Sequence, residues 1–185
     1  NLLGIRYMIL DKDSNLDSIK KFINQDWPAI RDSGKIFAFV VKKGAFGKSG
    51  KSFPVHKEQM EREYAICRFA DVLSNNDYVI SSTGKISREL YEHVKKTNPE
   101  MIGHDFLMIG SMGHADMIAL NIALRKKEKT IWCFDGDGAI LMHMGALATI
   151  GTLSPGNFLH VLFNNEAHES VGGMPTIAGK VDLSE

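Results

Sequence analysis

Residues 130–139, which read TIWCFDGDGA, decide the fold. Thr130–Phe134 is a predicted strand, and all its residues after Thr130 are apolar. Gly136, Asp137 and Gly138 follow it and lead into a predicted helix from Ala139. Such a turn brings backbone close to a ligand and offers the free N–H groups of a helix start to an anion. A carboxylate at Asp137 would repel a bound phosphate, so we expect a cation between them, most simply Mg²⁺.

A second turn follows the next predicted strand, Leu159–Phe163, and reads Asn164-Asn165-Glu166-Ala167-His168. Residues 139–163, which separate the two turns, fit one helix and one strand, so both turns should lie at one edge of a parallel sheet. An amide and a backbone carbonyl are neutral oxygen ligands suited to completing a Mg²⁺ shell.

Other interpretations of Gly-Asp-Gly are an ordinary turn, a dinucleotide fingerprint or an EF-hand. A fingerprint needs a third glycine near the position of Leu141, and an EF-hand needs Asp or Asn at the position of Ala139. The two turns at this spacing are typical of thiamine-diphosphate enzymes.

Around these turns, apolar runs alternate with helical spacing, which predicts an α/β fold with a parallel sheet flanked by helices on both faces. The expected strands are 5–10, 36–41, 78–80, 106–109, 130–134 and 159–163. The expected helices are 16–23, 56–73, 85–96, 113–125 and 139–150. We expect the strand 36–41 to be covered on both faces, a linker over 42–57, and a loop or lid over 172–185.

Composition narrows the classes of function. Lysine plus arginine and aspartate plus glutamate number 22 each, so the formal net charge is zero. The charge balance therefore gives no indication of binding to nucleic acid or to an anionic membrane. No apolar run approaches the roughly 20 residues of a membrane helix. Cys67 and Cys133 form no paired motif, and with no recognisable leader we expect free thiols and a cytoplasmic protein. The sequence starts at Asn1 rather than Met, so we expect a piece of a longer protein.

Three stretches, residues 82–90, 110–115 and 164–173, together resemble the phosphonopyruvate decarboxylase family, of which sulfopyruvate decarboxylase is a close relative. The resemblance implies that residues 48–185 form the diphosphate-binding domain of a thiamine-diphosphate fold. It also implies that residues 1–47 are the C-terminal remnant of a pyrimidine-binding domain plus the start of a linker.

The resemblance implies ligands as well. Asp137, Asn165 and the carbonyl of Ala167 would bind Mg²⁺. The cofactor would contact Thr83, Gly84, Lys85, Gly110, Met112, Gly136, Asp137, Gly138, Ala139 and Asn165. Met112 would wedge beneath the bent cofactor. His114 and His168 are candidates for substrate contact or proton transfer, with ordinary loop histidines as the alternative.

The implied reaction is decarboxylation of 3-phosphonopyruvate to 2-phosphonoacetaldehyde and CO₂, in which thiamine diphosphate stabilises the acyl carbanion. The family's activating Glu is expected upstream of Asn1, on a pyrimidine-binding domain of the same or a partner subunit. A homo-oligomer, at least a dimer, is therefore expected, and this chain alone should be inactive. The alternatives are sulfopyruvate as substrate, or a non-catalytic subunit that pairs with a separate pyrimidine-binding chain.

Overall fold

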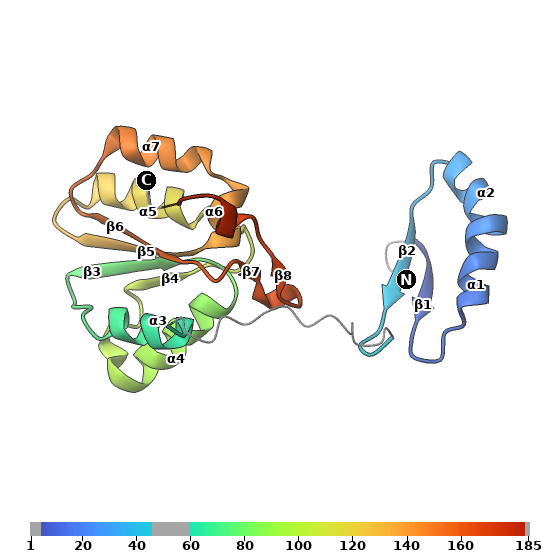
Figure 1. The fold of residues 1–185 in the computed structure, drawn as a ribbon, viewed down its shortest axis with the longest axis horizontal. Coiled ribbons are helices and arrows are strands. Elements are labelled where there is room, and N and C mark those ends of the chain that lie inside the picture. The colour runs from blue at the N-terminus through green and yellow to red at the C-terminus, as the bar shows by residue number, and fades with distance from the viewer. Residues whose placement is uncertain (1–4, 46–59, 184–185) are drawn as a thin grey trace. The chain divides into compact units, whose positions relative to one another are not determined.

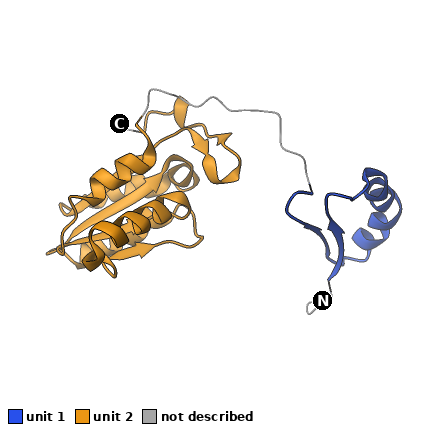
Figure 2. Ribbon diagram, turned by 90° about the horizontal axis from the view of Figure 1, so that it is seen from below, with its two compact units in different colours: residues 1–52 blue, residues 53–185 orange. Residues whose placement is uncertain are grey.

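The structure is a computed structural model that describes residues 5–45 and 60–183. The chain divides into two units, residues 1–52 and residues 53–185 (Figure 2). No sheet is shared between the described residues of the two units, so the units are described separately. No helix among the described residues has the length and apolar character needed to span a membrane.

The first unit is a β-α-β arrangement. Strands β1 (Arg6–Leu10) and β2 (Phe37–Val41) pair in parallel, and a helical segment connects them. This segment consists of α1 (Leu16–Lys21), a π-helical stretch (Phe22–Asp26) and α2 (Trp27–Asp32). The π-helical stretch ends directly before Trp27-Pro28, where proline has no N–H to continue the helical ladder.

One face of this small sheet packs against the helical segment. The ring of Phe22 stacks on that of Phe37 with centroids 4.3 Å apart and meets the edge of Phe39 at 5.4 Å. Leu10, Phe22 and Ile30 are the buried apolar residues of this unit within residues 5–45. These apolar side chains form the small core of unit 1.

The other face of the sheet is exposed. Tyr7 lies opposite Ala38 and Ile9 opposite Val40, so these side chains share a face, and Val40 keeps 47% of its surface accessible. The expectation that the strand 36–41 is covered on both faces is therefore wrong for the described residues. The reason is that the helical segment covers only one side of a two-stranded sheet.

The second unit contains a four-stranded parallel sheet with strand order β4-β3-β5-β6. Its strands are β3 (Asp77–Ser81), β4 (Asp105–Leu107), β5 (Thr130–Gly136) and β6 (Phe158–Phe163). Helices α3 (Arg62–Ala70) and α4 (Lys85–Thr97) lie on one face of the sheet, and α5 (Ala115–Arg125) lies on the other (Figure 1). The predicted α/β fold with helices on both faces is confirmed.

Alternation along the strands supplies two hydrophobic clusters, one per face. On β5, Phe134 faces α3 and α4 while Ile131 and Cys133 face α5, and all three are fully buried. Strand β5 is therefore covered on both sides, in agreement with the predicted parallel sheet flanked by helices.

Several elements differ from their predicted bounds. Strand β4 ends at Leu107 instead of Ile109, because its partner β3 ends at Ser81, which lies opposite Leu107. The helix expected over 139–150 is divided into α6 (Asp137–Met142) and α7 (Gly145–Leu153). The break falls at His143 and Met144, directly before Gly145, which is a poor helix former. The first residues of the helix expected over 56–73 lie outside the described residues, and α3 begins at Arg62.

The segment after β6 folds back on itself. Strand β7 (Ala167–His168) pairs antiparallel with β8 (Met174–Pro175), and single 3-10 turns cover Glu169–Val171 and Ala178–Lys180. Ala178 is buried. The region 172–185, expected as a loop or lid, thus contains the short strand β8 and one buried residue, Ala178.

Candidate cofactor and metal site

The two turns singled out in the sequence meet at the carboxyl edge of the sheet. Gly136, the last residue of β5, lies opposite Phe163, the last residue of β6. The residues that follow both strands line one cleft. The predicted site residues that line it are Thr83, Gly84, Lys85, Met112, Gly136, Asp137, Gly138, Ala139, Asn165, Ala167 and His168.

Asp137 is a buried carboxylate at the start of α6, with 3% of its surface accessible. It accepts a hydrogen bond from the hydroxyl of Thr176. Within residues 5–45 and 60–183, no Lys, Arg or His side chain forms an ion pair with it. Because a buried charge without a counter-charge is costly, the site fits a cation in the cleft.

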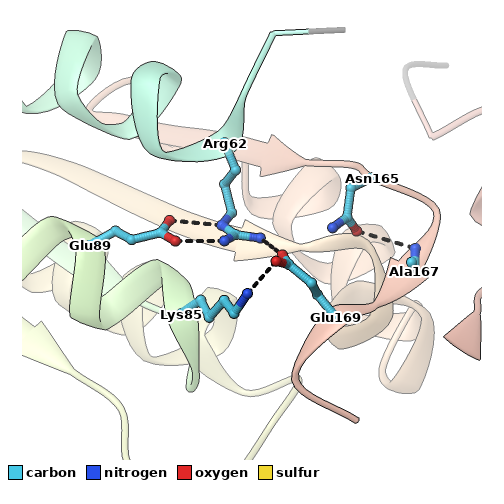
Figure 3. A network of polar contacts seen from close by, with 6 residues as sticks. All are labelled: Arg62, Lys85, Glu89, Asn165, Ala167 and Glu169. Carbon is cyan, nitrogen blue, oxygen red and sulfur yellow. Dashed lines mark hydrogen bonds and ion pairs between the residues drawn. The ribbon is translucent and has the colours of Figure 1, made fainter. Parts of the chain in front are cut away.

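Asn165 and Ala167, which carry the predicted neutral oxygen ligands, line the same cleft. The side-chain oxygen of Asn165 accepts a hydrogen bond from the N–H of Ala167 at 3.2 Å, which closes a tight turn (Figure 3). Pro175 lies opposite Ala167 in the β7–β8 pair. Because proline has no N–H, Pro175 cannot donate a hydrogen bond to the carbonyl of Ala167. One carboxylate, one amide and one carbonyl form a hard oxygen set of the type that Mg²⁺ prefers.

Gly138 is required by close packing. A Cβ atom there would lie 2.5 Å from the ring of His168 and 3.3 Å from the terminal methyl of Met112. Both side chains therefore lie against the first turn of α6, where backbone N–H groups have no helical partner. His168 and Met112 lie in the cleft, and their predicted roles stay predictions.

The loops after β3 and β4 are tied together beside the cleft. The hydroxyl of Thr83 accepts a hydrogen bond from the N–H of Gly110 at 3.2 Å. Gly84 has φ of 109°, which only glycine adopts easily, and α4 starts at the next residue, Lys85. Gly110 is thus adjacent to the cleft without lining it.

His114 faces elsewhere. It lines a separate hollow with Phe106 and Met117, and its ring lies 4.2 Å from that of His143. Its Nδ1 atom contacts the carbonyls of Ser111 and Met112 at 3.2 and 3.3 Å. In this chain His114 and His168 are therefore not brought together, and the catalytic role predicted for each stays a prediction.

Sequence reasoning missed an ion-pair network on the wall of the cleft (Figure 3). Arg62 donates to both carboxylate oxygens of Glu89, at 2.8 and 2.6 Å. Arg62 and Lys85 also both donate to Glu169, one to each oxygen. These hydrogen bonds from Arg62 and Lys85 lower the pKa of Glu169, and the bonds to Glu89 and Glu169 raise the pKa of Arg62. Arg62 lies 20 positions before the first motif stretch, which begins at residue 82. No sequence pattern around Arg62 indicates a role in the site.

A second cluster lies inside the sheet. Cys133, Asp135 and His160 place potential metal-binding atoms within 4.8 Å of one another, and no other such trio of His, Cys, Asp or Glu occurs in the described part of the chain. The Nε2 atom of His160 lies 3.7 Å from a carboxylate oxygen of the fully buried Asp135. This cluster shares no residue with the predicted magnesium site.

Comparison with known proteins points to the same part of the chain. Residues 82–185 match the family profile of the thiamine pyrophosphate enzyme, C-terminal TPP binding domain. This range contains all three stretches on which the resemblance rests and every predicted site residue.

The curated relatives are named as two kinds of decarboxylase, for phosphonopyruvate and for sulfopyruvate. The chain is 40% identical over 119 residues to a phosphonopyruvate decarboxylase of Streptomyces viridochromogenes, covering 64% of this chain and 28% of that protein. It is 40% identical over 124 residues to the sulfopyruvate decarboxylase subunit beta of Methanothermobacter thermautotrophicus, covering 67% of this chain and 63% of that one. The β subunit of Methanocaldococcus jannaschii is 38% identical over 115 residues, which cover 62% of this chain and 57% of that subunit. The match thus spans under a third of the first relative and about three fifths of the β subunits.

Proposed function

Because the chain belongs to the thiamine pyrophosphate enzyme family through its C-terminal TPP-binding domain, we propose that unit 2 supplies the diphosphate- and Mg²⁺-binding half of a thiamine-diphosphate-dependent decarboxylase. The observation that supports this proposal is that buried Asp137 lines the same cleft as Asn165 and Ala167. These residues would hold Mg²⁺, which would in turn bind the diphosphate.

The remaining residues of the cleft have separable tasks. Thr83, Gly84 and the first turn of α6 would orient the diphosphate through hydroxyl and N–H donors, and Lys85 would add a positive charge. Met112, beside Gly138, would support the cofactor from below. When bound, thiamine diphosphate supplies the electron sink for the carbanion left by loss of CO₂.

For the substrate we propose 3-phosphonopyruvate, which yields 2-phosphonoacetaldehyde and CO₂. Support comes from the resemblance of the three motif stretches and from relatives at 40% and 42% identity that carry the name phosphonopyruvate decarboxylase. Sulfopyruvate is the second candidate, because the chain covers a larger share of the sulfopyruvate decarboxylase β subunits.

The proposal requires a pyrimidine-binding domain with an activating Glu, on the same polypeptide or on a partner subunit. Unit 1 would be the last part of such a domain. A homo-oligomer in the cytoplasm would bring facing domains together, and Cys67 and Cys133, both free thiols, suit a reducing compartment. A cofactor-binding subunit without activity of its own is the alternative arrangement.

Cofactor binding tests the proposed site. Titration calorimetry of thiamine diphosphate with Mg²⁺ should show binding to the unaltered chain, weakened at least about 100-fold by Asp137→Ala because the metal loses its charged ligand. Asp105→Ala, at the opposite end of the parallel strands, is the matched control and should bind as the unaltered chain does. Equal affinity in the Asp137→Ala and control variants would refute the metal assignment.

Substrate choice needs the chain together with its pyrimidine-binding domain. We expect kcat/KM for 3-phosphonopyruvate to exceed the values for sulfopyruvate and pyruvate. A higher value for sulfopyruvate would establish the second candidate instead.

A further inference from the structure

The wall of the cofactor cleft holds two cations that converge on one carboxylate. Arg62 starts α3, Lys85 starts α4, and Glu169 lies on the 3-10 turn between β7 and β8. The guanidinium of Arg62 and the ammonium of Lys85 donate to different oxygens of Glu169 (Figure 3). Two cations that each donate a hydrogen bond to a different oxygen of one anion can also bind a phosphoryl group, because its oxygens accept hydrogen bonds in the same way.

Arg62 is held more firmly than Glu169, whereas the Lys85 side chain, at 44% accessible, is about as exposed as the carboxylate that it contacts. Glu89 fixes Arg62 through two hydrogen bonds, and both side chains of this pair are only 17% accessible. Arg62 and Lys85 belong to helices that pack on the hydrophobic core. Glu169 belongs to a single turn between two-residue strands, and its side chain is 40% accessible. The anion is therefore the partner that can leave.

Glu169 also conflicts with the chemistry of the cleft. A carboxylate and a phosphate about 4 Å apart repel each other by roughly 4 kcal/mol at an effective dielectric of 20. Arg62, Lys85 and Glu169 line the same cleft as Asp137 and Asn165. An anionic ligand in this cleft would bind more tightly if it replaced Glu169 on the two cations. It would bind more weakly if it lay beside Glu169, because the two negative charges repel each other.

We propose that Arg62 and Lys85 form a subsite for a phosphoryl group, and that Glu169 occupies this subsite until the phosphoryl ligand takes its place. The inference deepens the proposed function and rests on it. Arg62 and Glu169 thereby acquire roles that the motif stretches do not assign, with Glu89 as the residue that positions Arg62. The phosphoryl group can come from the cofactor's diphosphate or from the substrate's phosphonate.

Binding measurements on the full 185-residue chain separate the two sources. Inorganic pyrophosphate with Mg²⁺ represents the cofactor tail. Methylphosphonate, titrated into chain saturated with thiamine diphosphate and Mg²⁺, represents the substrate tail. Glu169→Gln keeps the shape of the side chain and removes its charge, so we expect about tenfold tighter binding of one probe. The probe that responds identifies the source.

Removal of either cation should have the opposite effect and weaken binding of the probe. The double variant Arg62→Met/Glu89→Gln removes the guanidinium without leaving an unpaired carboxylate, and we expect it to weaken the responding probe by about tenfold or more. Lys85→Met should weaken the same probe, and it supplies the test if circular dichroism shows that the double variant is unfolded. Glu63→Gln, an exposed charge change beside Arg62, is the matched control and should leave both affinities within about twofold.

Unchanged affinity for both probes in Glu169→Gln, or an equal gain in Glu63→Gln, would overturn the subsite. The two proposals fail separately. If Asp137→Ala abolishes cofactor binding while Glu169→Gln changes neither probe, the cofactor site stands and the subsite is wrong. If the chain binds no thiamine diphosphate while Glu169→Gln still strengthens pyrophosphate binding, the subsite stands and the proposed function is wrong.

Discussion

The two units contain strands of similar sequence character in different surroundings. Residues 37–41 and residues 131–134 are both unbroken apolar runs within parallel strands. In unit 2 the strand is covered by helices on both faces, whereas in unit 1 helices cover one face and leave Val40 exposed. An apolar run thus predicts a strand reliably, but whether both its faces are covered depends on how much other chain packs there.

Substitution of one aromatic residue in each unit should give the largest contrast. Phe134→Ala removes a fully buried ring that meets Phe69 and Phe163, and we expect it to lower the free energy of unfolding of unit 2 by about 3–5 kcal/mol. Phe39→Ala removes a partly exposed ring, so unit 1 should lose only about 1–2 kcal/mol.

Each unit carries its own reporter for this experiment, Trp27 in unit 1 and Trp132 in unit 2. Urea unfolding followed by fluorescence, with the other tryptophan replaced by Phe, measures each unit separately. Equal losses in the two units would contradict the contrast in burial.

Acid should weaken unit 2 through Asp77. Burial raises the pKa of this carboxyl, but hydrogen bonds from Ser74 and from the indole of Trp132 outweigh burial and lower it. A lowered pKa means that Asp77 stabilises unit 2 fully above about pH 4 and loses this contribution as pH falls through the folded-state value.

Asp77→Asn should therefore cost about 1–3 kcal/mol at pH 7 and flatten the acid limb of the stability curve. Urea unfolding from about pH 7 down to about pH 2 measures both effects. Asp32→Asn, at an exposed ion pair in unit 1, is the control and should change stability by under about 0.5 kcal/mol. An acid limb of unchanged steepness in Asp77→Asn would show that this carboxyl has no such role.

Polar substitution on the exposed face of unit 1 should give the smallest effect on stability. Val40→Glu is expected to change unfolding free energy by less than about 1 kcal/mol, because the side chain has little contact to lose. It should also reduce binding of an apolar fluorescent dye, since Tyr7, Ile9 and Val40 form one apolar face. Lys35→Glu, an exposed polar position in the same unit, should leave dye binding unchanged. A loss of several kcal/mol on Val40→Glu would mean that this face is packed.

Most of unit 2 and the centre of its site can be predicted from the sequence for one physical reason. Strands that are covered on both faces need continuous apolar runs, and their carboxyl ends must lie at one edge of a parallel sheet. The order of strands and turns along the chain is therefore enough to predict that Asp137 and Asn165 line one cleft. The division between α6 and α7, and the β7–β8 pair, depend on local packing that periodicity does not reveal.

The ion-pair network could not be predicted in the same way. Arg62 and Glu169 are 107 positions apart, and their contact depends on how α3 and the turn after β7 are placed on the sheet. Charged residues at helix starts are common, so neither Arg62 nor Lys85 is distinctive by itself. Only the fold shows that both cations point to one carboxylate.

The position of the metal tests the central claim most directly. Crystals of the chain grown with thiamine diphosphate and Mn²⁺ in place of Mg²⁺ would give an anomalous difference peak at each bound manganese. We predict one peak in the cleft, about 2.1 Å from oxygens of Asp137, Asn165 and Ala167. A peak at Cys133, Asp135 and His160 instead, or none within reach of all three predicted ligands, would contradict the account.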